Sequence, residues 1–215
     1  MKIVTGRHLA YPNPSPVLLT VGTRVISIFE DEETGGERSH DPNRQENYYS
    51  GLIVEPPKSM NKYRYLVFFD DGYAQYVKHE RILLVCECSR NVWEDIHPKS
   101  RDFIKNYLEQ YPERPMVKLQ PGQVVKTEWD GKWWIARVVQ VDGSLVKMHF
   151  DADDRTEWIY RGSTRLAPLY AAQAQAQARA EGNFSRMRGL GMATYKKVCF
   201  PYITIGIFAI ISSAI

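Results

Sequence analysis

Aromatic rings beside carboxylates are the residues of this chain whose chemistry could bind a ligand. The segment YLVFFDDGYAQYV, residues 65–77, places five aromatic residues around the adjacent acids Asp70 and Asp71. Ring faces attract a methylated ammonium, which keeps its charge but loses water easily, by about 0.5–2 kcal/mol for each ring. A nearby carboxylate would add Coulomb attraction. The alternative is purely structural: a half-buried strand, a turn at Asp71-Gly72 and a second strand.

The chain contains a second copy of the pattern around this segment. Gly22 is followed seven residues later by Phe29, and Gly122 is followed seven residues later by Trp129. The aromatic pair and strand YYSGLIVE (48–55) corresponds to WWIARVVQ (133–140). The third match aligns LVKMHFDADDRTEWI (145–159) with YLVFFDDGYAQYV (65–77). Phe69-Asp70 then corresponds to Phe150-Asp151, and Tyr76 corresponds to Trp158. This repeat predicts two copies of one small bent sheet.

Each copy places aromatic residues at strand ends that would meet on one rim of a barrel. In the first copy the candidate walls, with Asp70 or Asp71 as the acid, are Phe29, Tyr49, Phe69, Tyr73 and Tyr76. In the second copy, with Asp151 or Glu157 as the acid, they are Trp129, Trp134, Phe150 and Trp158. About half of these rings are expected to be ordinary core residues. Phe68 and Phe69 must point to opposite sides of their strand, and Phe68 is assigned to the core with Leu66.

The elements that must position these rings are short strands. Runs rich in Val, Ile, Phe and Tyr, separated by polar or Gly/Pro stretches, are typical of consecutive antiparallel strands. Strands so few and short curl into a barrel, because a flat sheet would leave its edges and one apolar face open. Apolar spacings of three, four and seven between residues 91 and 111 predict one or two helices, interrupted at His97-Pro98 and resuming at Asp102. The expected fold class is mainly β: two small bent five-stranded barrels joined by a short helical linker.

Composition shifts divide the chain into six segments. We expect a remnant of a preceding domain or linker (1–20), a barrel (21–88), a helical linker (89–115), a second barrel (116–170), an Ala/Gln-rich and basic linker, disordered or helical (171–197), and an apolar tail (198–215). Residues 30–47 are acidic and have no apolar periodicity, so they predict a long loop. The tail has 18 residues without charge, and it leaves open a membrane anchor, an abnormal C-terminus or a buried element.

Several classes of function find no support in composition and motifs. The net charge of +3 comes from 28 basic and 25 acidic residues mixed along the chain, which is too weak to indicate a nucleic-acid-binding protein. The three cysteines form neither a disulfide framework nor a zinc site, and no cofactor is expected. The sequence contains no GxSxG, HExxH, P-loop or dinucleotide-binding motif. A binding module is therefore the favoured class.

A series of motifs resembles a known family. In order along the chain these are VGTRV, FFDDGYAQYV, WEDI, RDFI, YPERPMV, KTEWDGKWW, VDGSLV and EWIYRGSTRLAP. They are similar to the tandem Tudor region of the bifurcated-SET histone H3 lysine 9 methyltransferases, the eggless-like enzymes. The resemblance implies a nuclear, chromatin-associated reader whose partner is a modified histone H3 tail, methylated at lysine 9 and acetylated at lysine 14, bound in a groove between two Tudor barrels.

The resemblance also implies roles for individual residues. The methyl-lysine site would consist of Phe29, Tyr49, Phe69, Asp70 and Tyr73. The acetyl-lysine and peptide site would consist of Phe103, Trp129, Phe150, Glu157 and Trp158. Phe103 enters through the motif RDFI alone, because its spacing by itself indicates only helix packing.

The chain also departs from the family pattern. Lys2–Tyr11 resembles only the end of a first Tudor domain, and nothing resembles the methyl-CpG-binding or split SET domains, so no methyltransferase activity is expected of this chain. Co-repressor proteins are further candidate partners, and a membrane is a partner only if the apolar tail is an anchor. The alternatives are a nucleic-acid-binding barrel, disfavoured because acids at the rim repel phosphate, and a membrane-tethered interaction fragment.

Overall fold

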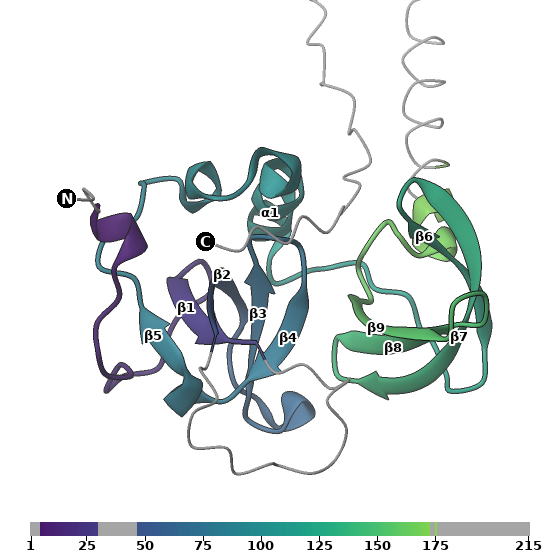
Figure 1. The fold of residues 1–215 in the computed structure, drawn as a ribbon, viewed down its shortest axis with the longest axis horizontal. Coiled ribbons are helices and arrows are strands. Elements are labelled where there is room, and N and C mark those ends of the chain that lie inside the picture. The colour runs from purple at the N-terminus through teal and green to yellow at the C-terminus, as the bar shows by residue number, and fades with distance from the viewer. Residues whose placement is uncertain (1–4, 30–46, 173–174, 176–215) are drawn as a thin grey trace, which may run out of the picture. The chain divides into compact units, whose positions relative to one another are not determined.

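The computed structural model describes residues 5–29, 47–172 and 175 (Figure 1). The chain divides into two compact units between Pro112 and Glu113. Each unit has a hydrophobic core of its own. The predicted loop at 30–47, except Asn47, and the apolar tail at 198–215 lie outside the described residues. Within the described residues no helix is long and apolar enough to cross a membrane.

The first unit contains a five-stranded antiparallel sheet in the order β4-β3-β2-β1-β5. Its strands are β1 (Arg24–Ile28), β2 (Tyr48–Glu55), β3 (Tyr65–Phe69), β4 (Ala74–Val77) and β5 (Ile82–Leu84). Short 3-10 helices, η1 to η4, lie at Gly6–His8, Ser59–Asn61, His79–Arg81 and Val92–Asp95. The segment before β1 joins this unit, because the Tyr11 amide donates to the Leu84 carbonyl (2.9 Å) and the Cys86 amide to the Leu9 carbonyl (2.8 Å).

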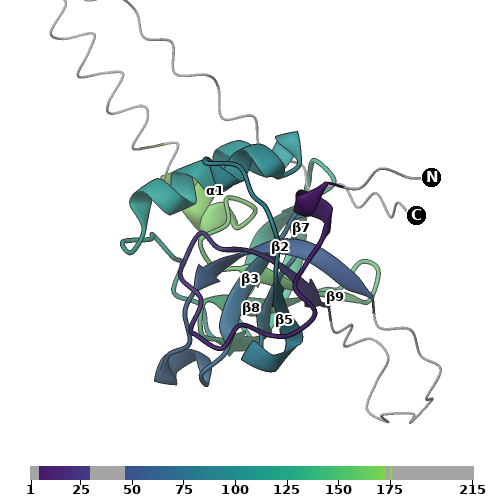
Figure 2. The same cartoon turned by 90° about the vertical axis from the view of Figure 1, so that its left-hand side faces the viewer.

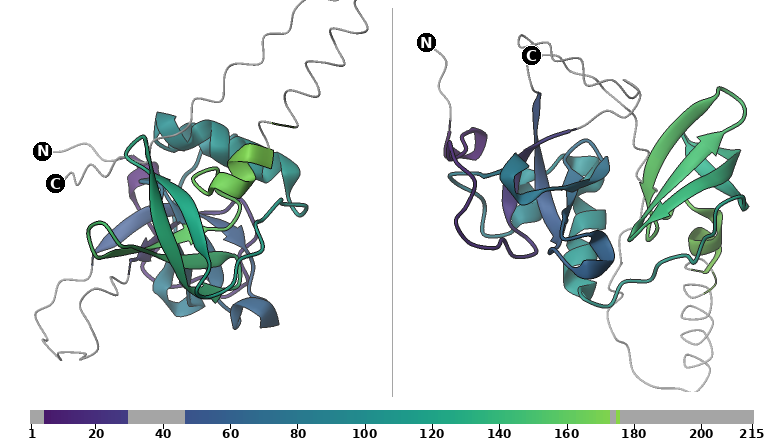
Figure 3. Two further views of the ribbon diagram at one scale, coloured as in Figure 1. Left: turned by 90° about the vertical axis from the view of Figure 1, so that its right-hand side faces the viewer. Right: turned by 90° about the horizontal axis from the view of Figure 1, so that it is seen from below.

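The second unit contains a four-stranded antiparallel sheet in the order β6-β7-β8-β9, whose curved strands are seen in Figure 3. Its strands are β6 (Val124–Trp129), β7 (Lys132–Asp142), β8 (Leu145–Phe150) and β9 (Arg155–Tyr160). The predicted fifth strand is reduced to one bridge between Thr127 and Leu166. The reason is local: the chain turns at Ser163 and becomes helical from Ala167, so no extended residues remain to continue the pairing.

The backbone confirms the internal repeat. The Gly22 amide donates to the Ile53 carbonyl (2.9 Å), and the Gly122 amide donates to the Val138 carbonyl in the same way (2.7 Å). In β2 and β3, Gly51 lies opposite Phe69, and in β7 and β8, Ala136 lies opposite Phe150. Both second strands carry an irregularity, at Ile53/Glu55 and at Val138/Gln140. The four strands β6 to β9 therefore repeat β1 to β4 in order and register.

A helix covers the outer face of the first sheet. Helix α1 (Pro98–Gln110) begins four residues before the predicted Asp102, with Pro98 in its first turn, a position that suits proline. The ring centroid of Phe68 in β3 lies 5.6 Å from that of Phe103 and 5.1 Å from that of Tyr107 in α1. The Tyr107 hydroxyl donates to the Val54 carbonyl of β2 (2.7 Å). Helix α1 lies alongside this sheet in Figure 2.

Burial on two sides explains why β3 shows no alternation of apolar and polar residues. All five residues of β3 are buried. Tyr65, Val67 and Phe69 belong to the core inside the barrel, whereas Phe68 points outward to α1. A strand covered on both faces gains from apolar residues at every position.

Candidate functional site

Four aromatic residues of the first unit meet at the ends of four strands. Phe29 follows β1, Tyr49 is near the start of β2, Phe69 ends β3, and Tyr73 precedes β4. Pairing places them together, since Tyr49 lies opposite Ser27, two residues before Phe29. The Phe69 amide donates to the Tyr73 carbonyl (2.9 Å). We call these four residues the four-ring cluster.

The rings of this cluster touch one another mainly edge to face. The ring centroid of Phe29 lies 5.5 Å from those of Phe69 and Tyr73 and 6.3 Å from that of Tyr49. Tyr49 and Phe69 are 6.4 Å apart. The planes of Phe29 and Tyr49 meet at 80°, and those of Tyr49 and Phe69 at 87°. Such angles present ring faces in several directions, as a site that surrounds a cation requires.

The four rings differ in how much of each side chain is exposed to solvent. Phe69 is 3% exposed and belongs to the barrel core, whereas Tyr49 is 42% exposed. Phe29 and Tyr73 are half-buried and pack against that core. The cluster is therefore an open end of the core, with Phe69 as its floor and Tyr49 at its rim.

A glycine allows β2 and β3 to approach below the cluster. A Cβ atom on Gly51 would lie 2.7 Å from Cγ1 of Val67 and 2.8 Å from the Phe68 carbonyl oxygen, closer than real atoms approach. Gly51 lies opposite Phe69 in the ladder and two residues after Tyr49. A side chain at this position would therefore push apart the strands that carry two of the four rings.

The turn between β3 and β4 brings Tyr73 beside Phe69. The Gly72 amide donates to the Phe69 carbonyl (2.9 Å), and Gly72 has a φ of 99°, which only glycine adopts without strain. A turn followed by a residue of positive φ is a common three-residue hairpin connection. Gly72 is thus needed for the position of Tyr73.

Asp70 is paired within the protein. Both of its carboxylate oxygens accept hydrogen bonds from the Arg24 guanidinium, at 2.6 and 2.7 Å. Arg24 is 7% exposed, so its charge needs this partner. Asp70 is one of the two acids predicted to lie beside a bound cation, but Arg24 already compensates its charge.

Asp71 is the acid of the turn that makes no ion pair among the described residues. Its side chain accepts a hydrogen bond from the Tyr73 amide (3.2 Å). Partial loss of hydration raises the pKa of Asp71, and the charge of Asp70 acts in the same direction, while the Tyr73 amide opposes the rise. Asp71 is exposed and lies two residues from a ring of the cluster, so its carboxylate is better placed than that of Asp70 to face an incoming cation.

The second unit brings together three rings at the equivalent place. The centroids of Trp129 and Trp134 lie 6.5 Å apart, and the Trp134 indole N–H donates to the Trp129 carbonyl (3.2 Å). Phe150, the equivalent of Phe69, is 1% exposed. The guanidinium carbon of Arg155 lies 4.1 Å from the Trp129 centroid and 4.4 Å from the Phe150 centroid.

The other predicted site residues make different contacts. Glu157 binds Arg165 through both oxygens, with Nη2 to Oε2 at 2.9 Å. Trp158 lies on the opposite face of β9 from Arg155 and Glu157, because side chains alternate along a strand. Its ring faces Lys147 instead, with Nζ 5.8 Å from the centroid. Phe103 belongs to the first unit, on α1. The acetyl-lysine roles of these residues stay predictions.

The predicted site residues did not include two arginines that the structure places at the sites, Arg24 and Arg155. The repeat contained a signal for the second one, because aligning Tyr76 with Trp158 also aligns Tyr73 with Arg155. A ring in one copy replaced by a cation in the other indicates that the two sites differ. No comparable signal exists for Arg24, whose partner is 46 residues away.

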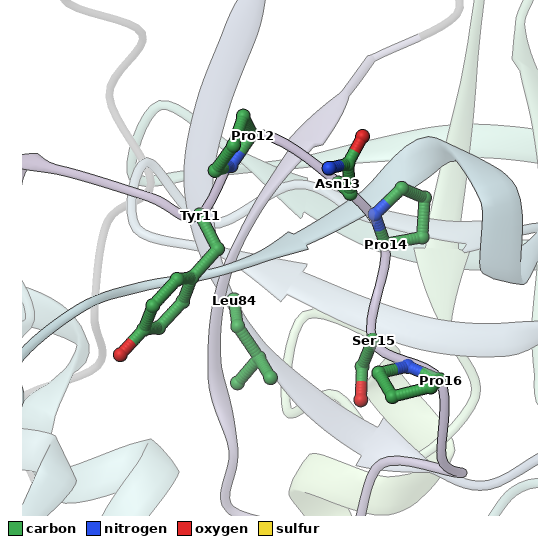
Figure 4. Close-up of a pocket in the computed structure, with 7 residues that line it drawn as sticks. All are labelled: Tyr11, Pro12, Asn13, Pro14, Ser15, Pro16 and Leu84. Carbon is green, nitrogen blue, oxygen red and sulfur yellow. The ribbon is translucent and has the colours of Figure 1, made fainter.

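A further cavity has few side chains that could bind a charged ligand. This open cavity of about 310 Å³ lies between the segment that precedes β1 and the end of β5 (Figure 4). It is lined by Tyr11, Pro12, Asn13, Pro14, Ser15, Pro16 and Leu84. None of these side chains is charged, and one is aromatic. Across the described parts of the chain, no group of three or more His, Cys, Asp or Glu residues could hold a metal ion.

Comparison with known proteins identifies both sheets. Residues 19–81 match a family model described as Histone methyltransferase Tudor domain 1, and residues 119–168 match one described as Histone methyltransferase Tudor domain. The histone-lysine N-methyltransferase eggless of Drosophila pseudoobscura pseudoobscura is 52% identical over 172 residues. The enzyme of the same name from Drosophila melanogaster is 51% identical over 173 residues. Each alignment covers 79% of this chain and 14% of the relative, so the chain spans about one seventh of their length.

A solved structure is also similar at a low level. The four MBT repeats of Drosophila melanogaster Sfmbt, in complex with a methyl-lysine peptide, match 69% of this chain and 36% of that chain, with 13% identity and a TM-score of 0.22. A match of this quality supports no inference about this chain. The two family models, in contrast, each match one of the two sheets, in agreement with the repeat. The chain therefore belongs to the histone-methyltransferase Tudor domain family, carries two such domains in tandem and corresponds to the tandem Tudor region of the eggless-like histone-lysine N-methyltransferases.

Proposed function

We propose that this chain is a chromatin reader that binds the histone H3 tail methylated at lysine 9 and acetylated at lysine 14. The methylated lysine would enter the four-ring cluster of the first Tudor domain. The observation that carries the proposal is this cluster, in which four rings from separate strand ends contact one another at the rim of the barrel. The reader would act in the nucleus, as expected for a part of a histone-modifying enzyme.

The chemistry of the cluster suits a methylated ammonium better than an unmodified lysine. An unmodified ammonium is strongly hydrated and loses much on leaving water, while methyl groups reduce that loss and gain contact with ring faces. Tyr49 and Tyr73 offer partly exposed faces, and Phe69 closes the floor. The Asp71 carboxylate adds Coulomb attraction at the open side.

The acetyl-lysine part of the proposal rests on the family resemblance. An acetylated lysine is neutral, so its recognition needs an apolar pocket rather than a cage with an acid. Phe103, Trp129 and Trp158 are the half-buried rings in the predicted set and the candidates for this contact. A groove between the two domains is the place the resemblance predicts for the peptide.

Titration with four H3-tail peptides tests the proposal. The peptides are unmodified, methylated at lysine 9, acetylated at lysine 14, and doubly modified, and calorimetry measures their dissociation constants. We expect the doubly modified peptide to bind most tightly and the unmodified one most weakly. Equal affinity for all four would refute the reader function, and a steep loss of binding with salt for every peptide would indicate simple charge attraction instead.

Tyr49 offers a variant that separates binding from folding. Tyr49→Ala removes a rim ring that is 42% exposed, so binding of the methylated peptide should weaken about 2- to 30-fold, the value of one ring–cation contact. The matched control is Tyr48→Ala, since Tyr48 is 48% exposed, adjacent in β2 and on the opposite face. If both variants weaken binding equally, the four-ring cluster is not the methyl-lysine site.

A further inference from the structure

Arg155 occupies in the second domain the place that Tyr73 has in the first. The amide of Phe69 donates to the Tyr73 carbonyl, so these two residues are opposite each other. The ladder of the second domain pairs Phe150 with Arg155 in the same way. Because Phe69 and Phe150 are equivalent in register, the fourth ring of the first domain corresponds to a guanidinium in the second.

The Arg155 guanidinium lies where a ligand cation would lie. Its central carbon is 4.1 Å from the Trp129 centroid and 4.4 Å from the Phe150 centroid, both within the usual range for a cation over a ring. The side chain is 22% exposed. Nε and Nη2 are buried and make no hydrogen bond with the described residues, so ring faces and ion pairs are what hold the guanidinium.

Two carboxylates hold the guanidinium in this place. Asp153 Oδ2 lies 3.4 Å from Nε, and Glu157 Oε2 lies 3.6 Å from Nη1. Glu157 is itself fixed by Arg165, which is 7% exposed and also donates through Nε to the Glu128 carbonyl (3.0 Å). The acids that would attract a ligand cation are therefore already engaged with arginines of the same domain.

We propose that Arg155 is a specificity-determining residue that occupies the ring site of the second Tudor domain and so restricts methylated ammonium ligands to the first. An internal cation on the faces of Trp129 and Phe150 excludes a second cation by volume and by charge. A ligand would have to displace it and break its two ion pairs. The inference rests on the proposed function only for the ligand chemistry of the rings.

The probe for this inference is tetramethylammonium chloride, with sodium chloride at equal ionic strength as the reference. The indole N–H signals of Trp129 and Trp134 report on the second domain in two-dimensional NMR spectra. The four-ring cluster contains no tryptophan, so these signals do not depend on binding in the first domain. In the wild-type chain we expect no saturable shift of either indole signal.

Removing the internal cation should open the site. Arg155→Ala leaves Glu157 paired with Arg165, and we expect saturable shifts of both indole signals with the probe. Arg155→Tyr, which installs the ring that Tyr73 supplies in the first domain, should give the same result if the alanine variant does not fold. The matched control is Arg137→Ala, because Arg137 is 52% exposed and its ion pair with Asp151 (3.7 Å) lies outside the rings.

Each outcome decides the inference. Saturable shifts in the Arg155 variants, but not in the wild type or in Arg137→Ala, support it. A saturable shift in the wild type overturns it, and so does a folded Arg155→Ala or Arg155→Tyr whose indole signals do not respond. The peptide titration can fail while this test succeeds, because loss of H3 binding by the first domain leaves the two indole signals unaffected.

Discussion

Phe69 has two roles in the first Tudor domain. It is a core residue, 3% exposed, in contact with the interior of the barrel. It is also the floor of the four-ring cluster. A substitution there therefore changes packing and ligand contact together, which makes the choice of replacement decisive.

Truncation of Phe69 should destabilise the fold. Phe69→Ala removes a buried ring and should lower the free energy of unfolding by about 3–5 kcal/mol, so loss of peptide binding by this variant would not isolate the cluster. Phe69→Leu keeps most of the volume and should cost about 1–2 kcal/mol, while it removes the ring face. Urea unfolding followed by circular dichroism measures the first effect, and calorimetry with the doubly modified peptide measures the second. A Phe69→Leu variant that binds like the wild type would remove Phe69 from the site.

At the scale of elements, Asp95 at the end of η4 connects this 3-10 helix to Ser89 and to the N-terminal segment of the first unit. The Asp95 carboxylate accepts hydrogen bonds from the Ser89 amide (2.6 Å) and the Ser89 hydroxyl (2.7 Å). It also pairs with Arg7 from the N-terminal segment (3.1 Å), and its side chain is 6% exposed. Loss of hydration acts to raise the pKa of Asp95, but the hydrogen bonds from Ser89 and the charges of Arg7 and Arg24 outweigh it and lower the pKa.

The lowered pKa predicts a dependence of stability on pH. The folded chain releases the Asp95 proton more readily than the unfolded chain, so the contribution of this group is present above the ordinary aspartate pKa of 3.8 and is lost as pH falls through the folded-state pKa. Asp95→Asn should lower the free energy of unfolding by about 1–3 kcal/mol at pH 7, with a smaller difference from wild type in acid. Urea unfolding at several pH values measures this, with Asp102→Asn on the exposed side of α1 as control. A difference that is constant with pH would contradict the assignment.

On the scale of the whole molecule, the two Tudor domains have separate cores. The core of the first includes Val25, Ile53, Val67 and Phe69, and that of the second includes Val138, Val146, Met148 and Phe150. No residue belongs to both. We therefore expect each domain to lose stability only from substitutions in its own core.

Met148 and Val67 test this independence. Met148 is fully buried, and Met148→Ala should lower the free energy of unfolding of the second domain by about 2–5 kcal/mol. Its unfolding can be followed by tryptophan fluorescence, because the second domain contains Trp129, Trp133, Trp134 and Trp158, whereas the first unit contains Trp93. Val67→Ala should give the converse result, with amide signals of the first domain as the readout. Movement of both transitions by either substitution would show that the domains unfold as one unit.

Much of the fold could be predicted from local patterns. Strand runs, the helical spacing near residue 100 and the repeat are properties of residues close in sequence, and they led to two small barrels with Phe69 and Phe150 at equivalent positions. Two features differed from the prediction: the helix starts at Pro98, and a single bridge to β6 replaces the predicted fifth strand of the second sheet. Both depend on how the chain turns at the end of an element. Alternation along β3 correctly placed Phe68 and Phe69 on opposite faces, since it follows from backbone geometry alone. The core assignment differed: Phe69 lies in the core inside the barrel, and Phe68 packs against α1.

The sequence by itself determined which rings belong to each copy and that they would lie at strand ends. Only the tertiary structure decided which charges remain free to meet a ligand. Arg24 and Asp70 are 46 residues apart, and the barrel must close before they meet. Arg155 lies on the rings of Trp129 and Phe150 at the point where β6 and β8 end and β9 begins. Long-range pairing of charges depends on the arrangement of strands in space, and periodicity along the chain contains no information about it.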